Sequence, residues 1–106
     1  MANNSTTFPV IPAGFAEMLI EEHGLAQQDI VLIEECSELQ KALCKSQRRR
    51  NKNLQEDKAA LIEEMAHVLM SMQINMVTHG ITMDEIHDAF SAKLAEYSGN
   101  DHNGNI

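Results

Sequence analysis

Residues 59–79 read AALIEEMAHVLMSMQINMVTH, a helix-length run that decides the fold. Most positions are apolar, but one polar stripe recurs at steps of three and four: Glu64, His67, Ser71, Asn75 and Thr78. Residues at that spacing share one face of a helix. A helix that is hydrophobic on most sides is normally buried, and a buried carboxylate or imidazole must be paired or bound to a metal. The run therefore predicts a core helix with a ligand-bearing stripe.

A second acidic group lies upstream, in the run Ile33-Glu-Glu-Cys-Ser-Glu-Leu39. Glu35 and Glu38 are three residues apart, as are Glu64 and His67, and side chains at this spacing project together from a helix. On two antiparallel neighbouring helices, the two pairs supply four ligands that converge on one point. Carboxylate oxygens suit Mg²⁺ and Mn²⁺, whereas imidazole favours Mn²⁺ or a transition metal. The two pairs predict a divalent cation site.

Each of these residues also has a purely structural interpretation. Glu34 and Glu35 can simply be solvated, and Glu38 can pair with Lys41 or Lys45 on the same helix. A lone histidine such as His67 is more often a neutral core residue bonded to a carbonyl than a metal ligand. The sequence leaves these interpretations open.

Length, composition and charge limit the classes of protein to which the chain can belong. The 106 residues are enough for one domain, and a 43 % apolar content with seven Met and no Trp predicts an adaptable aliphatic core. The net charge of −8 argues against a nucleic acid polymer as partner. Seven of the eight basic residues lie between Lys41 and Lys58. This basic segment is either a solvated turn or a patch that attracts phosphates.

The cysteines and the apolar runs indicate a cytoplasmic protein. Cys36 and Cys44 are eight residues apart on one predicted helix, which is about 12 Å and beyond disulfide reach. A reducing compartment follows from that spacing. No basic leader and no uninterrupted membrane-length apolar run is present, so we expect no membrane partner.

Helical periodicity without any useful β alternation predicts an all-α protein with four helices, at about 12–23, 26–47, 54–79 and 83–97. Gly24 and Gly80 mark helix ends, and Thr82-Met-Asp-Glu85 is a capping box that opens the last helix.

The domain organisation follows from these elements. Residues 1–12 are an extended N-terminal arm, 13–98 a single α-helical domain and 99–106 a flexible tail rich in Gly and Asn. Short turns between helices predict a four-helix bundle, and apolar surface on several sides predicts contact with another copy of the chain.

The run 33–39 followed by Leu61-Ile-Glu-Glu-Met-Ala-His-Val-Leu69 resembles the all-α nucleoside triphosphate pyrophosphohydrolases of the MazG type. Their pattern is E-E-x-x-E followed, after a gap, by E-x-x-D, and the 25 residues between Glu38 and Glu64 fit that gap. The resemblance implies a MazG-like bundle that cleaves a (d)NTP to the (d)NMP and pyrophosphate, with Mg²⁺ as cofactor and a role in nucleotide-pool housecleaning. It also implies a homodimer or homotetramer with the site near a subunit interface.

The resemblance also assigns roles to residues. Glu35, Glu38, Glu64 and the position of His67 would hold the metal, and Glu34 or Glu38 would position the attacking water or take its proton. The residues expected to contact the nucleotide are Lys93, Arg48, Arg49, Asn75 and Tyr97.

Two positions depart from the family pattern. His67 replaces the final Asp, which shifts the metal preference toward Mn²⁺ or another divalent metal, or removes a ligand. Tyr97 stands four residues after Lys93, where an Asn is expected, so the nucleotide base is not defined.

Two other classes of protein fit part of the pattern. Glu64-x-x-His67 is also the element that di-iron carboxylate bundles use, and a homodimer would supply it twice. Alternatively, the fold is a non-catalytic interaction module in which His67 records a lost metal site.

Overall fold

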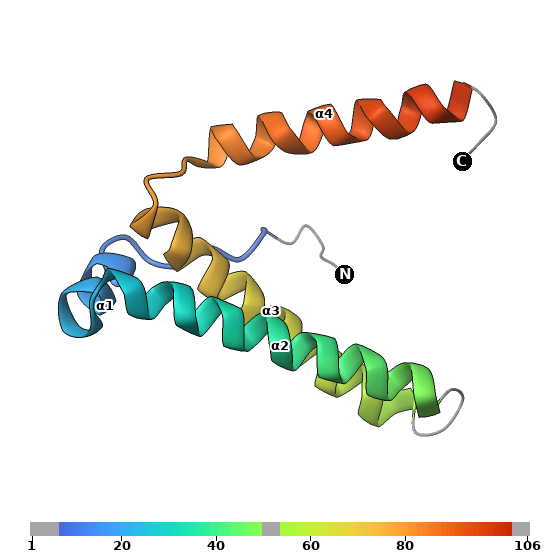
Figure 1. The fold of residues 1–106 in the computed structure, drawn as a ribbon, viewed down its shortest axis with the longest axis horizontal. Coiled ribbons are helices and arrows are strands. Elements are labelled where there is room, and N and C mark those ends of the chain that lie inside the picture. The colour runs from blue at the N-terminus through green and yellow to red at the C-terminus, as the bar shows by residue number, and fades with distance from the viewer. Residues whose placement is uncertain (1–6, 50–53, 103–106) are drawn as a thin grey trace.

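The computed structural model describes residues 7–49 and 54–102 (Figure 1). All regular structure in these two ranges is helical: α1 is Phe15–His23, α2 is Leu25–Arg49, α3 is Leu54–Thr78 and α4 is Met83–His102. The predicted all-α class and the four helices are confirmed. In the same ranges, no helix combines the length and apolarity that a membrane crossing requires.

Helices α2 and α3 form a long antiparallel hairpin, and the short α1 packs against both of them at one end (Figure 1). The seam of this hairpin is unusually polar. Within the described ranges, Ala16 and Ile74 are the buried apolar residues, whereas the buried polar residues are Gln28, Asp57 and Ser71, together with Gln73, which faces the arm. The expectation that α3 is buried on most sides is therefore wrong for the single chain, because Met65, Met70 and Met72 remain 40 % or more exposed.

Helix α1 starts at Phe15, three residues after the predicted start at Pro12. Gly14 adopts φ +84°, a left-handed conformation that glycine accepts without strain. The Phe15 N–H donates to the Pro12 carbonyl at 3.1 Å, so residues 12–15 form a turn that precedes the helix. The helix ends before Gly24, as predicted.

The connection between α3 and α4 has the geometry that its sequence predicts. Gly80, at φ +64°, donates to Val77 O, and the Ile81 N–H donates to Met76 O, which together make a Schellman motif. Thr82 and Glu85 exchange backbone-to-side-chain hydrogen bonds of 2.8 and 3.1 Å, which is the predicted capping box.

Helix α4 runs to His102, five residues beyond the predicted end at Tyr97. Once a helix is nucleated, each added residue contributes one more hydrogen bond, so weak helix formers can continue it. Residues 103–106 of the expected flexible tail lie outside the described ranges.

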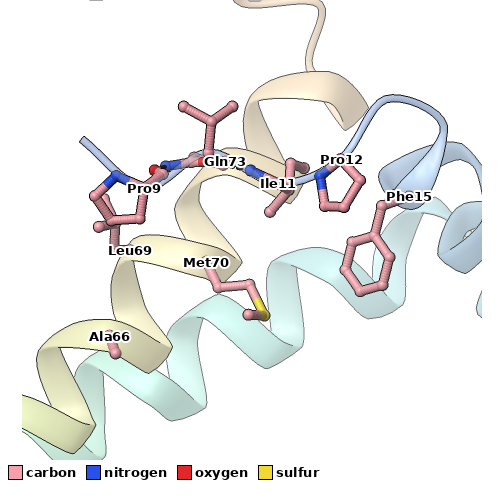
Figure 2. A pocket seen from close by; sticks show the side chains of 9 residues that line it. Pro9, Ile11, Pro12, Phe15, Ala66, Leu69, Met70 and Gln73 are labelled. Carbon is pink, nitrogen blue, oxygen red and sulfur yellow. Dashed lines mark hydrogen bonds between the residues drawn. The ribbon is translucent and has the colours of Figure 1, made fainter. Parts of the chain in front are cut away.

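The N-terminal arm is extended over the residues that the structure describes, 7–12, and crosses α3 on the side away from α2 (Figure 2). The side-chain amide of Gln73 holds it: Oε1 accepts from Ile11 N–H at 2.9 Å, and Nε2 donates to Pro9 O at 2.8 Å. Pro12 and Phe15 help line a mainly apolar pocket of about 370 Å³ beneath the arm. The arm therefore belongs to the folded structure.

Helix α4 diverges from the other elements after the capping box (Figure 1). Among the described residues, it packs against none of the other three helices. The single chain thus contains a three-helix unit and a fourth helix that projects from it.

Candidate metal centre

Two helices bring three of the predicted ligands together. Glu35 lies on the side of α2 that faces α3, and Glu64 and His67 lie one turn apart on α3. His67 Nδ1 is 3.6 Å from Glu35 Oε1 and 3.5 Å from Glu64 Oε1. One ligand atom from each residue lies within 4.8 Å of the others, so the three form a compact donor set. We call it the Glu35–Glu64–His67 cluster.

The cluster is partly exposed to solvent. The side chains of Glu35 and Glu64 are 28 % and 23 % exposed, and that of His67 is 46 % exposed. Glu64 Oε1 is shielded from solvent and, among the described residues, accepts no hydrogen bond. A shielded carboxylate oxygen without a hydrogen-bond donor is unfavourable unless a cation lies nearby.

This donor set suits a divalent cation. Two ligands bonded to one cation at about 2.1 Å are at most about 4.2 Å apart, and both separations from His67 Nδ1 are shorter than that. Two carboxylates and an imidazole form a mixed set that favours Mn²⁺ or a transition metal over Mg²⁺. A bound cation would also satisfy Glu64 Oε1.

The other two glutamates of α2 lie outside the cluster. Glu38 makes an ion pair with Lys41 at 3.3 Å, which is the structural interpretation that the sequence left open. Both side chains are at least half exposed, so this pair is weak and easily exchanged. Glu34 is exposed on α2. The roles predicted for Glu38 and Glu34 stay predictions.

The predicted phosphate-binding residues are not gathered at the cluster within one chain. Arg48 is exposed at the far end of α2, thirteen residues or about 20 Å along the helix from Glu35. The side chain of Arg49 lies outside the described residues. On α4, Lys93 pairs with Glu96 at 2.9 Å and lies 5.3 Å from the centre of the Tyr97 ring.

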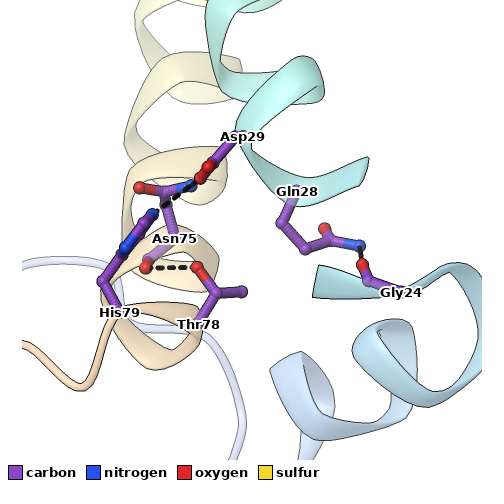
Figure 3. A network of polar contacts seen from close by, with 6 residues as sticks. All are labelled: Gly24, Gln28, Asp29, Asn75, Thr78 and His79. Atoms are coloured by element: carbon purple, nitrogen blue, oxygen red, sulfur yellow. Dashed lines mark hydrogen bonds and ion pairs between the residues drawn. The ribbon is translucent and has the colours of Figure 1, made fainter. Parts of the chain in front are cut away.

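Asn75 takes part in a second polar contact between α2 and the end of α3 (Figure 3). Asp29 Oδ1 accepts from Asn75 Nδ2 at 2.5 Å and lies 2.8 Å from His79 Nε2. These hydrogen bonds, the one with His79 first, lower the pKa of Asp29 below its ordinary value of 3.8. The contact fixes the open end of the hairpin, and this gives Asn75 a structural role in the single chain.

Sequence reasoning missed two residues of this network, Asp29 and His79. A third residue, Thr78, was recognised only as part of the polar stripe, and its hydroxyl donates to the Asn75 carbonyl at 2.7 Å. His79 and Asp29 carried no sequence signal, because their meeting depends on the register of two helices fifty residues apart.

The comparisons with known proteins leave the family open. No family model matches the chain, and no curated protein or solved structure matches it either. The resemblance to MazG-type enzymes therefore rests on the two acidic motifs alone.

Proposed function

We propose that the chain is a metal-dependent nucleoside triphosphate pyrophosphohydrolase of the MazG type, which converts a (d)NTP to the (d)NMP and pyrophosphate. One observation carries the proposal: Glu35 from the first acidic motif meets Glu64 and His67 from the second across the α2–α3 seam. In the pattern that the sequence resembles, these two motifs together hold the metal. The meeting of the two motifs is what this function requires.

Each acidic residue and His67 has its own role in the proposed reaction. Glu35 and Glu64 hold the cation by their carboxylates, with His67 as the neutral imidazole ligand. The cation supplies positive charge that neutralises the triphosphate oxygens. Glu38 is on the turn of α2 that follows Glu35, and its weak pair with Lys41 leaves it available to become a further ligand or to take a proton from the attacking water.

The most exposed residue of the cluster indicates the direction from which the substrate approaches. His67 is the most exposed of the three, so the triphosphate approaches from its side, and Glu64 lies deeper in the seam. Phosphate contacts by Arg48, Arg49 and Lys93 remain part of the proposal. The described side chains of Arg48 and Lys93 do not lie at the cluster in the single chain, so an oligomer would have to bring them there.

The test is product analysis with a matched pair of variants. Purified full-length chain is incubated with a panel of standard and modified (deoxy)nucleoside triphosphates in Mg²⁺, Mn²⁺ or Co²⁺, and monophosphate and pyrophosphate are quantified. We expect both products in a 1:1 ratio, with Mn²⁺ supporting more turnover than Mg²⁺. Glu64→Gln should reduce turnover at least about 100-fold, because a direct ligand matters more than a supporting group, whose loss already costs 10–100-fold.

Glu63→Gln is the matched control, because Glu63 precedes Glu64 on α3 but is exposed. It should retain wild-type turnover. Release of orthophosphate instead of pyrophosphate, or wild-type turnover by Glu64→Gln, would contradict the proposal. Silence across the panel with a tightly bound metal would favour the non-catalytic module.

A dimeric di-iron carboxylate protein is the second candidate, and the geometry gives it specific support. The cluster consists of one Glu from one helix and a Glu-x-x-His pair from another, which is half of a di-iron site. Reconstitution with Fe²⁺ in air tests it. Two irons per dimer with an iron-dependent absorption band would favour this candidate, whereas one Mn²⁺ per chain and no such band would favour the hydrolase.

A further inference from the structure

Helix α2 carries a row of basic residues beyond the cluster. Lys41, Lys45 and Arg48 follow one another at steps of four and three residues, which keeps them on one side of the helix. All three are exposed. The formal net charge of the chain is −8, so this row interrupts an acidic background. Positive charge concentrated on one side of a helix attracts anionic ligands.

Lys41 is the member of this row that lies nearest to the cluster. It follows Glu35 by six residues, or about 9 Å along the helix axis, whereas Lys45 is about 15 Å away. Side chains of an α-helix lean toward its N-terminus, and for Lys41 this is the direction of Glu35. The structure shows this lean, because Lys41 Nζ lies 3.3 Å from Glu38 Oε2. The ammonium of Lys41 therefore lies beside the turn of α2 that follows Glu35.

The carboxylate that Lys41 contacts is an easily replaced partner. The side chains of Lys41 and Glu38 are 72 % and 51 % exposed, and an exposed ion pair of this kind contributes little to stability. A phosphate group carries more negative charge than a carboxylate and offers more acceptor oxygens. Phosphate is therefore a stronger partner for the ammonium of Lys41 than Glu38 is.

Lys58 on α3 lies equally near to the cluster along its helix but is directed away from it. It is also exposed, and it precedes Glu64 by six residues. Because helical side chains lean toward the N-terminus, that of Lys58 leans away from Glu64. Its nine-residue separation from His67 is about two and a half helical turns, so the two side chains leave α3 on opposite sides. The two lysines therefore differ in direction rather than in distance along the helix.

We propose that Lys41 exchanges Glu38 for the phosphate chain of a nucleoside triphosphate at the cluster, and so binds the substrate within one chain. The proposal rests on the proposed function, because it assigns a phosphate-binding residue to the same site. In the single chain, the described side chains of Arg48 and Lys93 do not lie at the cluster. Lys41 supplies the cationic contact that these two residues do not make there.

The experiment uses inorganic tripolyphosphate as the probe, because this molecule carries a phosphate chain without a nucleoside. Its binding to the full chain is measured by isothermal titration, with both solutions equilibrated in the same saturating Mg²⁺. Lys41→Gln should weaken binding at least about tenfold, because one charge-assisted contact is lost. Lys41 is largely exposed, so the variant should keep its helical circular dichroism.

Lys58→Gln is the matched control, because it removes the same charge at an exposed site six residues from a ligand of the cluster. It should bind tripolyphosphate as the wild type does. A wild-type chain that does not bind tripolyphosphate would overturn the proposal, and so would unchanged binding by Lys41→Gln. Equal losses in the two variants would overturn it too, because they would indicate a general effect of net charge.

Amine footprinting tests the same contact in the unaltered chain. Lysines are acetylated briefly with and without tripolyphosphate in saturating Mg²⁺, and the extent of modification at each position is measured by mass spectrometry. Tripolyphosphate should slow the acetylation of Lys41 and leave that of Lys58 unchanged. Equal acetylation of Lys41 under the two conditions would overturn the proposal.

These binding measurements are separate from the turnover test of the proposed function. If the chain releases pyrophosphate from a (d)NTP while Lys41→Gln binds tripolyphosphate normally, the role of Lys41 is wrong and the proposed function stands. If binding depends on Lys41 in a chain without turnover, the role of Lys41 is supported and the proposed reaction is contradicted.

Discussion

The α2–α3 hairpin and helix α4 place their polar and apolar residues in opposite ways. In the hairpin, the inner seam holds Gln28, Asp57 and Ser71 in buried positions, while Met65 and Met70 on α3 are about half exposed. In α4, the polar residues are exposed as usual, but so is an apolar stripe that consists of Met83, Ile86, Phe90, Leu94 and Tyr97. The difference shows that polar groups are gathered where two helices meet, whereas the apolar stripe of α4 is left uncovered within the chain. The following predictions test this comparison, from the largest expected effect to the smallest.

Removing a carboxylate from the seam should strongly weaken metal binding. Glu35→Gln replaces an anionic ligand by a neutral amide and should weaken Mn²⁺ binding roughly 100-fold by isothermal titration. Glu34→Gln, one residue earlier and exposed, should bind as the wild type does. Wild-type Mn²⁺ affinity in the Glu35→Gln variant would show that Glu35 does not hold the metal.

Exchanging the imidazole for a carboxylate should change which metal the seam prefers. His67→Asp supplies a third hard oxygen ligand, so the ratio of Mg²⁺ to Mn²⁺ affinity should rise by roughly one order of magnitude. Competition titrations of the two metals measure this ratio directly. An unchanged ratio would mean that His67 does not contact the metal.

Releasing the arm should destabilise the outer face of α3 and leave the seam unchanged. Gln73→Leu removes the partners of Ile11 N–H and Pro9 O, and we expect a loss of about 1–2 kcal/mol in the free energy of unfolding. Hydrogen exchange at Ile11 should accelerate, and Mn²⁺ affinity should not change. Gln40→Leu, at an exposed site on α2, is the control. Slow exchange at Ile11 in the Gln73→Leu variant would show that other contacts hold the arm.

The contact of Asp29 with Asn75 and His79 should make hairpin stability depend on pH in the acid range. Because the folded-state pKa of Asp29 lies below 3.8, its contribution is complete above the unfolded pKa and is lost as the pH falls through the lowered value. The urea midpoint of Asp29→Asn should be lower than that of wild type at pH 7, and the difference should vanish near pH 2. Asp88→Asn on α4 should show no such pH-dependent difference.

The local elements of the fold were predictable from sequence because their signals are local. Gly80 ends α3 in a left-handed conformation, and Thr82 and Glu85 reciprocate their hydrogen bonds within one turn. The meeting of Glu35 with Glu64 and His67 was also predictable, since spacing places each group on one helix face and a short turn makes the helices antiparallel.

Long-range placements were not predictable in the same way. Periodicity shows that α4 has an apolar side, but it does not show whether that side packs on its own chain. The amide of Gln73 binds backbone atoms of the arm, and no sequence pattern marks backbone partners. Glu38 illustrates competition between partners, because the spacing alone allows it to join the cluster or to pair with Lys41, and in the structure it pairs with Lys41.

The side-chain amide of Gln73 holds residues 9–11 of the arm through their backbone atoms. Its amide contacts a carbonyl and an N–H, so these two hydrogen bonds depend on the extended backbone of the arm and not on its side chains. Position 11 must keep an N–H and therefore excludes proline, whereas position 9 needs only its carbonyl. A peptide that replaced the arm would therefore need an extended backbone at positions 9–11 and apolar side chains that fit the pocket on α3.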